Sequence, residues 1–315
     1  MKAQESKRSG HEFNIVLPAT SANLGPAFDA AALALNLALR IGAHKSRSFS
    51  ITATGRDSEI CGRIENHLIL TTYKEVLSSE RKPAPALALS IENRFPIGKG
   101  FGSSAAARLA GIALAVHFGN LKWSSNRIIA EASGREHHPD NVAACWMGGL
   151  TVARMLGESE SQVARFVPKG KWPLLLAIPD ESLATEKARD VLPLEYSRAD
   201  AVANIQNSML LLAALFQGDR KMLASSLEDR IHQPYREPLC PLLPALRNFA
   251  DEGVLGAVLS GAGPSVLMFL DPKARPDKVR AKIESYLREK GMRAELLLAA
   301  IARRGGEASF QRRSG

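Results

Sequence analysis

The chain has 315 residues, of which 45% are hydrophobic and 23% are charged, and its formal net charge is +9 at pH 7. This length allows one large domain or two ordinary ones, and the composition is typical of a globular protein in water. No apolar run reaches the roughly 18 residues that cross a bilayer, so we expect no membrane partner.

The cysteines and the distribution of charge indicate the cellular compartment and the kind of partner. The three cysteines, Cys61, Cys145 and Cys240, are far apart and odd in number, which favours a reducing cytoplasm over a disulfide framework or a zinc site. We expect no nucleic-acid partner, because +5 of the +9 lies at the two ends, before residue 12 and from residue 303 on. Aromatic residues make up 6% and do not alternate with basic ones. We expect disordered tails over residues 1–11 and 304–315.

The apolar pattern divides the first half of the chain into strands and helices. Strands are predicted at 13–17, 33–41, 49–54, 87–91 and 150–155, and helices at 66–79, 104–118 and 125–133. Residues 18–29, between the first two strands, have the Pro, Gly and Asn content of a turn-rich loop.

Between a predicted strand and a predicted helix lies P-I-G-K-G-F-G-S-S-A-A-A, residues 96–107. Glycine lets the backbone adopt positive φ and approach a ligand closely. A helix that starts at Ser103 or Ser104 points unpaired N–H groups at this loop, which favours phosphate. Lys99 adds a positive charge, and the serine hydroxyls can ligate Mg²⁺. The spacing matches neither a Walker P-loop nor a complete G-x-G-x-x-G, and a structural turn before a helix is the alternative.

Residues 131–141, E-A-S-G-R-E-H-H-P-D-N, form a second polar patch. His137, His138 and Asp140 can be read as metal ligands, but adjacent histidines seldom point at one ion and no cysteine pattern supports zinc. Pro139 near a first turn, with short polar residues around it, favours the start of a new helix.

The order of predicted elements changes at a strand over 174–178, where a second set of strands and helices begins. We therefore place the domain boundary near residue 167. Helices are predicted at 199–217, 219–232, 241–252 and 278–288, a strand–glycine turn–strand over 258–266, and a last strand at 295–302. This βααβαβ-like order fits a ferredoxin-like second domain.

The string P-x-G-x-G-x-G-S-S-A-A resembles the nucleotide loop of the GHMP kinases, with Phe101 where that family usually has Leu. Further strings, in the same order along the chain, resemble the homoserine kinases of this family, and together the strings span roughly residues 13–302. They are A-T-S-A-N-L-G-P-A-F-D (19–29), H-P-D-N-V-A with a later Gly-Gly (138–149), T-E-K-A-R-D-V-L-P (185–193), D-R-I-H-Q-P-Y-R (229–236) and V-L-S-G-A-G-P-S-V (258–266). Ala27 departs from the family's second glycine.

The resemblance implies an α+β, two-domain GHMP kinase fold. Residues 12–166 would form the N-terminal α/β nucleotide-binding domain and residues 167–303 the ferredoxin-like C-terminal domain, with the substrate between them. The implied activity is ATP-dependent phosphorylation of the side-chain hydroxyl of L-homoserine to O-phospho-L-homoserine, in threonine biosynthesis. The implied partners are L-homoserine, ATP and Mg²⁺, and a homodimer is left open.

The resemblance also implies roles for single residues. The ATP-binding set is Pro96, Ile97, Gly98, Lys99, Gly100, Phe101, Gly102, Ser103, Ser104, Ala105 and Ala106. The substrate-binding set is Asn23, His138, Asp140, Asn141, Arg189 and Arg236. The two arginines suit a carboxylate, which a guanidinium grips with two hydrogen bonds.

For Mg²⁺ the resemblance implies Ser104 and an upstream glutamate. We choose Glu131, because it would lie at a helix end facing the loop, and Glu136 is the alternative. Ser104, Glu131 and Asn141 form the implied catalytic set. Asn141 cannot take a proton at neutral pH, so the substrate's proton would pass to solvent or phosphate.

Two other functions stay open from the sequence. One is a GHMP kinase for another small alcohol, such as mevalonate, and the other is a non-catalytic sensor of small molecules on the same fold. Mevalonate lacks an amino group, so a requirement for Asp140 would favour homoserine, whereas a sensor need not keep metal ligands. ATP-dependent turnover of a panel of small alcohols distinguishes the three.

Overall fold

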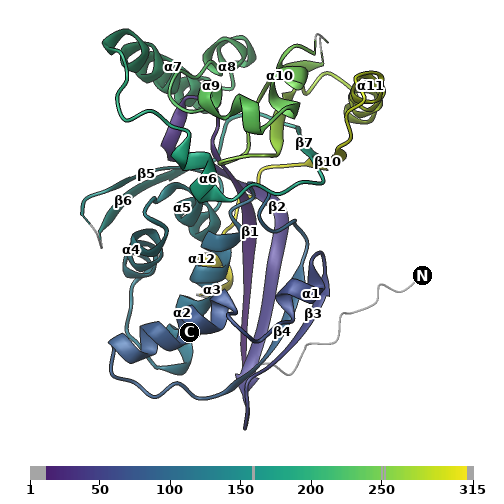
Figure 1. Cartoon of the computed structure of the whole chain (residues 1–315). Helices are drawn as coiled ribbons and strands as arrows, with labels where there is room; N and C mark the ends of the chain where they lie inside the picture. Colours follow the sequence, from purple (N-terminus) through teal and green to yellow (C-terminus); the bar gives the residue numbers. More distant parts are fainter. Residues whose placement is uncertain (1–11, 158–159, 250, 252, 311–315) are drawn as a thin grey trace.

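The computed structural model describes residues 12–157, 160–249, 251 and 253–310. It contains two sheets, each formed by one half of the chain, with helices packed on both (Figure 1). The predicted boundary near residue 167 falls in the connection between the last strand of the first sheet and the first strand of the second. The α+β class and the two-part organisation are therefore confirmed.

The first sheet has six strands. They are β1 (Phe13–Asn23), β2 (Ala27–Lys45), β3 (Ser50–Gly55), β4 (Leu87–Asn93), β5 (Leu150–Met155) and β6 (Ser161–Phe166). Their order is β3-β4-β2-β5-β6, with β1 paired along β2, and every pair is antiparallel except β3 with β4. The sequence pattern did not predict β6, in which no residue is fully buried.

The loop predicted over 18–29 is wrong. β1 continues to Asn23 and β2 begins at Ala27, so the two strands form a hairpin with a tight turn. Asn23, Leu24 and Gly25 adopt φ of 71°, 47° and 84°, and a Cβ on Gly25 would lie 2.7 Å from the Leu227 carbonyl oxygen. Turn residues are thus confined to this corner, and the polar residues before it belong to a buried strand.

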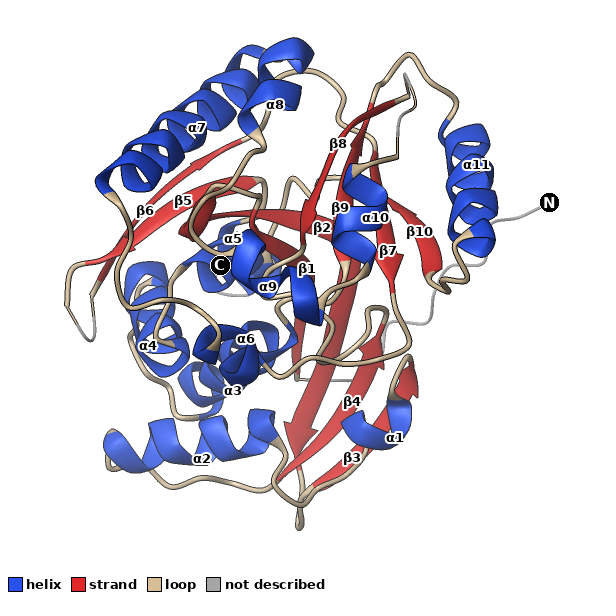
Figure 2. Cartoon of the chain, turned by 45° about the horizontal axis from the view of Figure 1, so that its top comes forward, coloured by secondary structure: helices blue, strands red, loops and turns tan. Residues whose placement is uncertain are grey.

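Helices of the first half are α1 (Ser58–Cys61), α2 (Leu68–Ser79), α3 (Ser103–Phe118), α4 (Ser125–Glu136) and α5 (Asp140–Met147). Helices α2 to α5 lie together on one side of the sheet (Figure 2). α3 is rich in alanine and leucine on all sides and lies between α2, α4, α5 and β1, so it is largely buried. Its first turn is therefore held firmly at the end of the glycine loop.

The second sheet has strands β7 (Leu174–Ile178), β8 (Val254–Leu259), β9 (Val266–Leu270) and β10 (Glu295–Ala299), in the order β10-β7-β9-β8 and all antiparallel. Its helices are α6 (Thr185–Asp190), α7 (Arg198–Gln217), α8 (Arg220–Ser226), α9 (Gln233–Arg236), the 3-10 turn η1 (Glu237–Leu239), α10 (Leu242–Arg247) and α11 (Pro276–Glu289). If α6 to α10 count as one connection, the order is βαββαβ, which confirms the ferredoxin-like prediction.

The helix predicted over 219–232 is only half right. α8 ends at Ser226, and the chain then turns at Asp229, whose carboxylate accepts the backbone N–H groups of Ile231, His232 and Gln233. This side chain replaces the helical hydrogen bonds, so the turn is built where the apolar pattern alone indicates a helix.

The predicted C-terminal tail is wrong as far as residue 310. Backbone hydrogen bonds pair residues 300–302 with residues 34–36 of β2, and α12 (Gly306–Phe310) packs on β1. Phe310 contacts the rings of Phe13 and Trp146 and so anchors α12. The sequence pattern did not predict this helix, because five residues are too few to show a helical period. Residues 1–11 and 311–315 of the predicted tails lie outside the described residues.

Candidate active site

A cavity of about 450 Å³ lies where the glycine loop, the α4–α5 turn and the second half of the chain meet. The predicted residues that line it are Asn23, Gly98, Gly100, Phe101, Gly102, Ser103, Ser104, Glu136, His138, Asp140, Asn141, Arg189 and Arg236. The predicted residues that do not line it are Pro96, Ile97, Lys99, Ala105, Ala106 and Glu131. The fold thus gathers residues more than 200 positions apart in sequence around one space.

The three glycines of the loop differ in how much space the protein leaves for a side chain. All have positive φ, of 71° at Gly98, 86° at Gly100 and 66° at Gly102. A Cβ at Gly100 would overlap the Ser260 carbonyl oxygen, and one at Gly102 would overlap the Thr20 hydroxyl. A Cβ at Gly98 would find only the Ser182 Cβ, at 3.8 Å. At Gly98, therefore, protein packing leaves room that a ligand can use.

Lys99 does not point into the cavity. Its Nζ donates to the carbonyl oxygens of Pro179 and Asp180, at 2.7 and 2.9 Å. The interpretation of Lys99 as a phosphate ligand is therefore wrong for this structure, because two carbonyls of the second half already hold the ammonium. Lys99 instead ties the glycine loop to the end of β7.

A second, apolar cavity of about 500 Å³ adjoins the first and shares Gly98, Ser103 and Ser104 with it. Its apolar lining comes from α1, α2, β4 and the loops around them, and includes Cys61, Ile69, Ile91, Phe95, Ile97 and Leu183. Sequence reasoning missed this cavity, since its residues are scattered and each looks like an ordinary core residue.

The two glutamates that are candidates for the metal, Glu131 and Glu136, lie differently relative to the cavity. The Ser104 hydroxyl donates to Glu136 Oε1 at 2.6 Å, and Arg108 Nε donates to the same oxygen at 2.6 Å. Glu131 does not line the cavity and pairs at 2.9 Å with Arg135, which does line it. The geometry favours the alternative, Glu136, over the first choice, Glu131, because the docking of α4 on α3 turns Glu136 toward the loop.

A charged cluster forms the other side of the cavity. Arg189 grips Asp29 with two hydrogen bonds of 2.9 and 2.8 Å, and His138 Nδ1 bonds to Asp140 Oδ1 at 2.6 Å. Burial lowers the pKa of His138, but the hydrogen bond and charge of Asp140 outweigh it, so the pKa is raised. Likewise burial lowers the pKa of Arg189, and Asp29 more than restores it.

Asn141 lies between the charged cluster and the glycine loop. Its Oδ1 accepts a hydrogen bond from the Thr20 hydroxyl at 2.6 Å, and its backbone N–H donates to Asp140 Oδ1 at 2.6 Å. A Cβ on Gly102 would also come within 2.9 Å of Asn141 Oδ1. Asn141 therefore links the two parts of the cavity through a side chain whose orientation is fixed.

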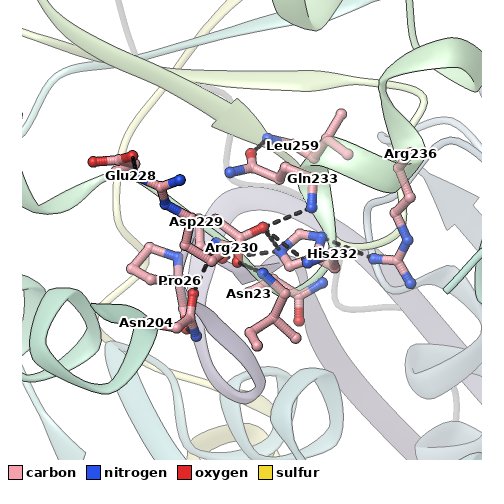
Figure 3. Close-up of polar contacts among 12 residues, drawn as sticks. Asn23, Pro26, Asn204, Glu228, Asp229, Arg230, His232, Gln233, Arg236 and Leu259 are labelled. Carbon is pink, nitrogen blue, oxygen red and sulfur yellow. Dashed lines mark hydrogen bonds and ion pairs between the residues drawn. The ribbon is translucent and has the colours of Figure 1, made fainter. Parts of the chain in front are cut away.

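Arg236 is 1% exposed and lines the cavity, and it lies beside His232 (Figure 3). Its Nε donates to the Ala188 carbonyl at 2.8 Å and its Nη1 bonds to His232 Nδ1 at 3.1 Å, so Nη2 is left for a ligand. Burial, together with the charge of Arg189, lowers the pKa of Arg236 to about 10. The arginine therefore stays charged at neutral pH.

His232 holds Arg236 as a neutral imidazole. Its Nε2 donates to the Gly25 carbonyl at 2.9 Å, which leaves Nδ1 as the acceptor for Arg236. Burial lowers the pKa of His232 to about 4, against the charge of Asp229, which raises it. The imidazole thus connects the turn between β1 and β2 with the arginine of α9.

This imidazole predicts a pH dependence of stability. Because the pKa of His232 is lower in the folded chain, the unfolded chain binds its proton first, and stability is lost as the pH falls from about 6.5 to about 4. The variant His232→Gln should lose less unfolding free energy between pH 7 and pH 5 than the wild type. Chemical denaturation at the two pH values measures it, with the exposed His44→Gln as control. An equal loss in His232→Gln and the wild type would contradict the prediction.

Sequence reasoning missed several residues of the site, among them Asp29, Arg108, Asp229 and His232. Asp29 lies in the string 19–29, and Asp229 and His232 lie in the string 229–236. Both strings resemble the family, but in them only Asn23 and Arg236 were assigned a role. Arg108 has no local signal, since one arginine on an alanine-rich helix reads as a solvated residue.

Known proteins are similar to this chain over most of its length. The family model described as GHMP kinases N terminal domain matches residues 67–149, and the model described as GHMP kinases C terminal matches residues 211–289. A homoserine kinase from Solibacter usitatus is 41% identical over 297 residues, which cover 94% of this chain and 96% of that protein. One from Synechococcus sp. is 36% identical, covering 92% and 96%. The crystal structure of homoserine kinase from Cytophaga hutchinsonii has a similar fold, with TM-score 0.79, 22% identity and coverage of 97% and 99%.

Proposed function

The chain belongs to the GHMP kinase family and within it to the homoserine kinases, and we propose that it transfers the γ-phosphoryl group of ATP to the side-chain hydroxyl of L-homoserine. The observation that carries this proposal is the single cavity in which a glycine loop, a serine–glutamate pair and two arginines meet. The product is O-phospho-L-homoserine, an intermediate of threonine biosynthesis, and the three buried free cysteines suit a cytoplasmic enzyme.

ATP fits the two adjoining cavities. The apolar cavity of about 500 Å³ suits the adenine ring, and the shared edge at Gly98, Ser103 and Ser104 suits the phosphate chain. The phosphates then lie at the N-terminus of α3, where unpaired N–H groups and the helix dipole favour negative charge.

The residues present also fit Mg²⁺, because Ser104 and Glu136 offer two oxygens side by side at the phosphate end of the cavity. We infer that these two residues hold the ion, whose charge would neutralise the phosphate oxygens of the bound nucleotide. Arg108, whose Nε lies 2.6 Å from Glu136 Oε1, holds that carboxylate in place through a charge-assisted hydrogen bond.

L-Homoserine is a zwitterion, and the charged cluster offers both signs. Arg236 Nη2 and Arg189 suit the substrate carboxylate, while Asp29 and Asp140 suit its ammonium group. The ligand atoms of Asp29, His138 and Asp140 lie within 4.8 Å of one another, which is the spacing of one small cationic group. Asn23 supports this cluster, because its Oδ1 accepts the Asp29 N–H at 2.9 Å.

With the ends of the substrate held there, its hydroxyl points toward Asn141 and the glycine loop. Asn141 orients the hydroxyl but cannot take its proton, and Asp140 Oδ1 already accepts from His138 and Asn141. We therefore infer that the proton passes to a phosphate oxygen or to solvent. Catalysis then rests on positioning and on charge neutralisation rather than on a protein base.

The decisive experiment is ADP release from ATP with a panel of small alcohols, together with phosphorus NMR of the product. Turnover of L-homoserine well above that of mevalonate and other alcohols supports the proposal. Preference for another alcohol would support a kinase but contradict L-homoserine as its substrate. Absence of turnover with any alcohol would favour a sensor of small molecules.

The room beside Gly98 predicts a selective loss of nucleotide binding. In Gly98→Ala the new Cβ meets no protein atom closer than 3.8 Å but lies at the edge shared by the two cavities. We expect the Kd for ATP to rise about tenfold or more, equivalent to ~1.4 kcal/mol. Isothermal titration calorimetry measures it.

Gly170→Ala is the matched control, since Gly170 has φ of 87° and nothing within 4 Å of its Cβ position. Both variants carry the same backbone strain of about 1–2 kcal/mol. Equal ATP affinity in the two variants would remove Gly98 from the nucleotide site.

A further inference from the structure

Thr20 is a fully buried polar residue of β1 that contacts both parts of the candidate active site. Its backbone N–H donates to the Phe101 carbonyl oxygen of the glycine loop at 3.0 Å, and its hydroxyl donates to Asn141 Oδ1 at 2.6 Å. Thr20 does not itself line the cavity. It can therefore affect a reaction in the cavity only through the groups that it holds.

The pairing of β1 with β2 explains why Thr20 is available for these contacts. Pro18 pairs with Ala38, but Thr20 pairs with Ala34, so β2 has extra residues between the two pairs. Such bulges bend a strand locally, and they are common beside active sites because they direct a side chain toward the site. The irregularity lies next to Thr20, whose N–H donates outside the hairpin, to the glycine loop.

The Thr20 hydroxyl favours one orientation of the Asn141 amide. The oxygen of this amide only accepts hydrogen bonds and its nitrogen only donates, although the two ends have nearly the same size. Asn141 Nδ2 lies 3.4 Å from Asp140 Oδ1, a carboxylate oxygen that accepts, and this leaves the amide oxygen for the hydroxyl. Because the contact to Asp140 is long and the contact to Thr20 is 2.6 Å, Thr20 provides the stronger constraint.

We propose that Thr20 is a positioning residue for phosphoryl transfer, which fixes the Asn141 amide so that the substrate hydroxyl is held in line with the γ-phosphorus. The proposal rests on the proposed function, in which Asn141 orients that hydroxyl. Transfer needs the reacting atoms at a narrow range of distance and direction, and a displacement of about 1 Å can cost roughly 100-fold in rate. Loss of the Thr20 hydroxyl should therefore lower kcat and leave the binding of both substrates nearly unchanged.

A purely structural role is the competing explanation, because buried polar groups are normally hydrogen-bonded whatever their function. Such a role predicts lower stability without a selective loss of kcat, whereas positioning predicts a loss of kcat that a hydroxyl at this position restores. Thr151 of β5 offers a matched control. It is as buried as Thr20 and lies in the same sheet, and its hydroxyl has no hydrogen-bond partner among the residues that the structure describes.

Steady-state kinetics of variants at Thr20 tests the proposal. Valine keeps the shape of threonine and removes the hydroxyl, so we expect kcat for L-homoserine to fall about 10- to 100-fold in Thr20→Val. Thr20→Ala, which also lacks the hydroxyl, should show the same loss if the valine variant does not fold. Both KM values should stay within about threefold of the wild type, and Thr20→Ser should keep kcat within about threefold. Thr151→Val should match the wild type.

Three kinetic results would overturn the proposal. They are an unchanged kcat in folded variants without the Thr20 hydroxyl, an equal loss in Thr20→Ser, and a rise in KM in place of a fall in kcat. Melting temperatures of all variants show which of them are folded.

A double-mutant cycle tests whether Thr20 acts through Asn141. In the background of Asn141→Ala there is no amide to orient, so adding Thr20→Val should change kcat by less than about twofold. Losses that multiply in the double variant would mean that the two residues act independently, and the positioning role would then be wrong.

The Asn141 amide can also be observed without turnover, which separates this proposal from the identity of the substrate. In protein labelled with ¹⁵N at asparagine, the side-chain resonance of Asn141 is identified by its loss in Asn141→Ala. We expect this resonance to shift in Thr20→Val and not in Thr151→Val, and an unshifted resonance in Thr20→Val would overturn the proposal. Turnover of another alcohol in place of L-homoserine would contradict the proposed substrate, and kcat for that alcohol would then decide the role of Thr20.

Discussion

Replacing Arg236 with alanine is expected to lower kcat/KM for L-homoserine by roughly 30- to 4000-fold. Removing one member of a desolvated charge pair costs about 2–5 kcal/mol, and each ~1.4 kcal/mol is a factor of ten. Arg236 is 1% exposed, so it is not a solvated surface residue whose loss costs nothing. Because it lies at the end of the cavity that we propose for L-homoserine, the affinity for ATP should change far less. Steady-state kinetics with each substrate varied in turn measures both effects.

Two controls separate this role from a structural one. Arg236 also bonds to Ala188 and His232, so the melting temperature of the variant must be compared with the wild type. Arg247→Ala, a partly exposed arginine paired with Glu237, removes the same side chain away from the cavity and should have little effect. A loss under about threefold in folded Arg236→Ala, below 1 kcal/mol, would remove the residue from the substrate site.

Replacing Glu136 with glutamine is expected to lower kcat by about 30-fold or more. The reason is the same as for Arg236: removing one member of a desolvated charge pair costs about 2 kcal/mol or more. The substitution keeps the size of the side chain but removes the carboxylate that meets Ser104 and Arg108. If Glu136 binds Mg²⁺, the Mg²⁺ concentration for half-maximal ATP binding should also rise, a readout that does not depend on turnover. Titration calorimetry at several Mg²⁺ concentrations provides it.

Glu131→Gln is the matched control, because it makes the same change on the same helix. Glu131 pairs with Arg135 and does not itself line the cavity, so we expect kcat within about twofold of the wild type, the size of a surface ion-pair effect. A steep loss in Glu131→Gln with a mild one in Glu136→Gln would return the metal ligand to the residue that the sequence favoured.

The sequence predicts those parts of the site that are contiguous in the chain. The glycine loop and the His138–Asn141 string carry their chemistry within a few residues, and turn and cap preferences place them correctly. Arg189 and Arg236 were found because their strings resemble a family, since a lone arginine has no local signal. The family fold follows from the same strings, and the matching models and relatives confirm it.

The remaining errors concern how elements dock. Glu131 and Glu136 differ by little more than one turn of α4, and only its packing against Arg108 of α3 decides which glutamate meets Ser104. From the sequence, Lys99 is a candidate phosphate ligand. In the structure its ammonium group donates to the carbonyl oxygens of Pro179 and Asp180 in the other half of the chain. Such partners, about 80 residues away, leave no trace in a local pattern.

The return of the chain end to the first sheet has a consequence for biosynthesis. Val16 N–H donates to the Ser309 hydroxyl across 293 residues of sequence, and residues 300–302 occupy the edge of β2 between β5 and β4. The nucleotide half is therefore complete only after the second half has been synthesised, because its last edge and the cover on β1 come from residues 300–310. While the second half is translated, the edge of β2 stays open, and unpaired strand edges are sites of aggregation. Docking of residues 300–310 thus completes the assembly of the first half, and a chain that lacks these residues would leave this edge of β2 unpaired.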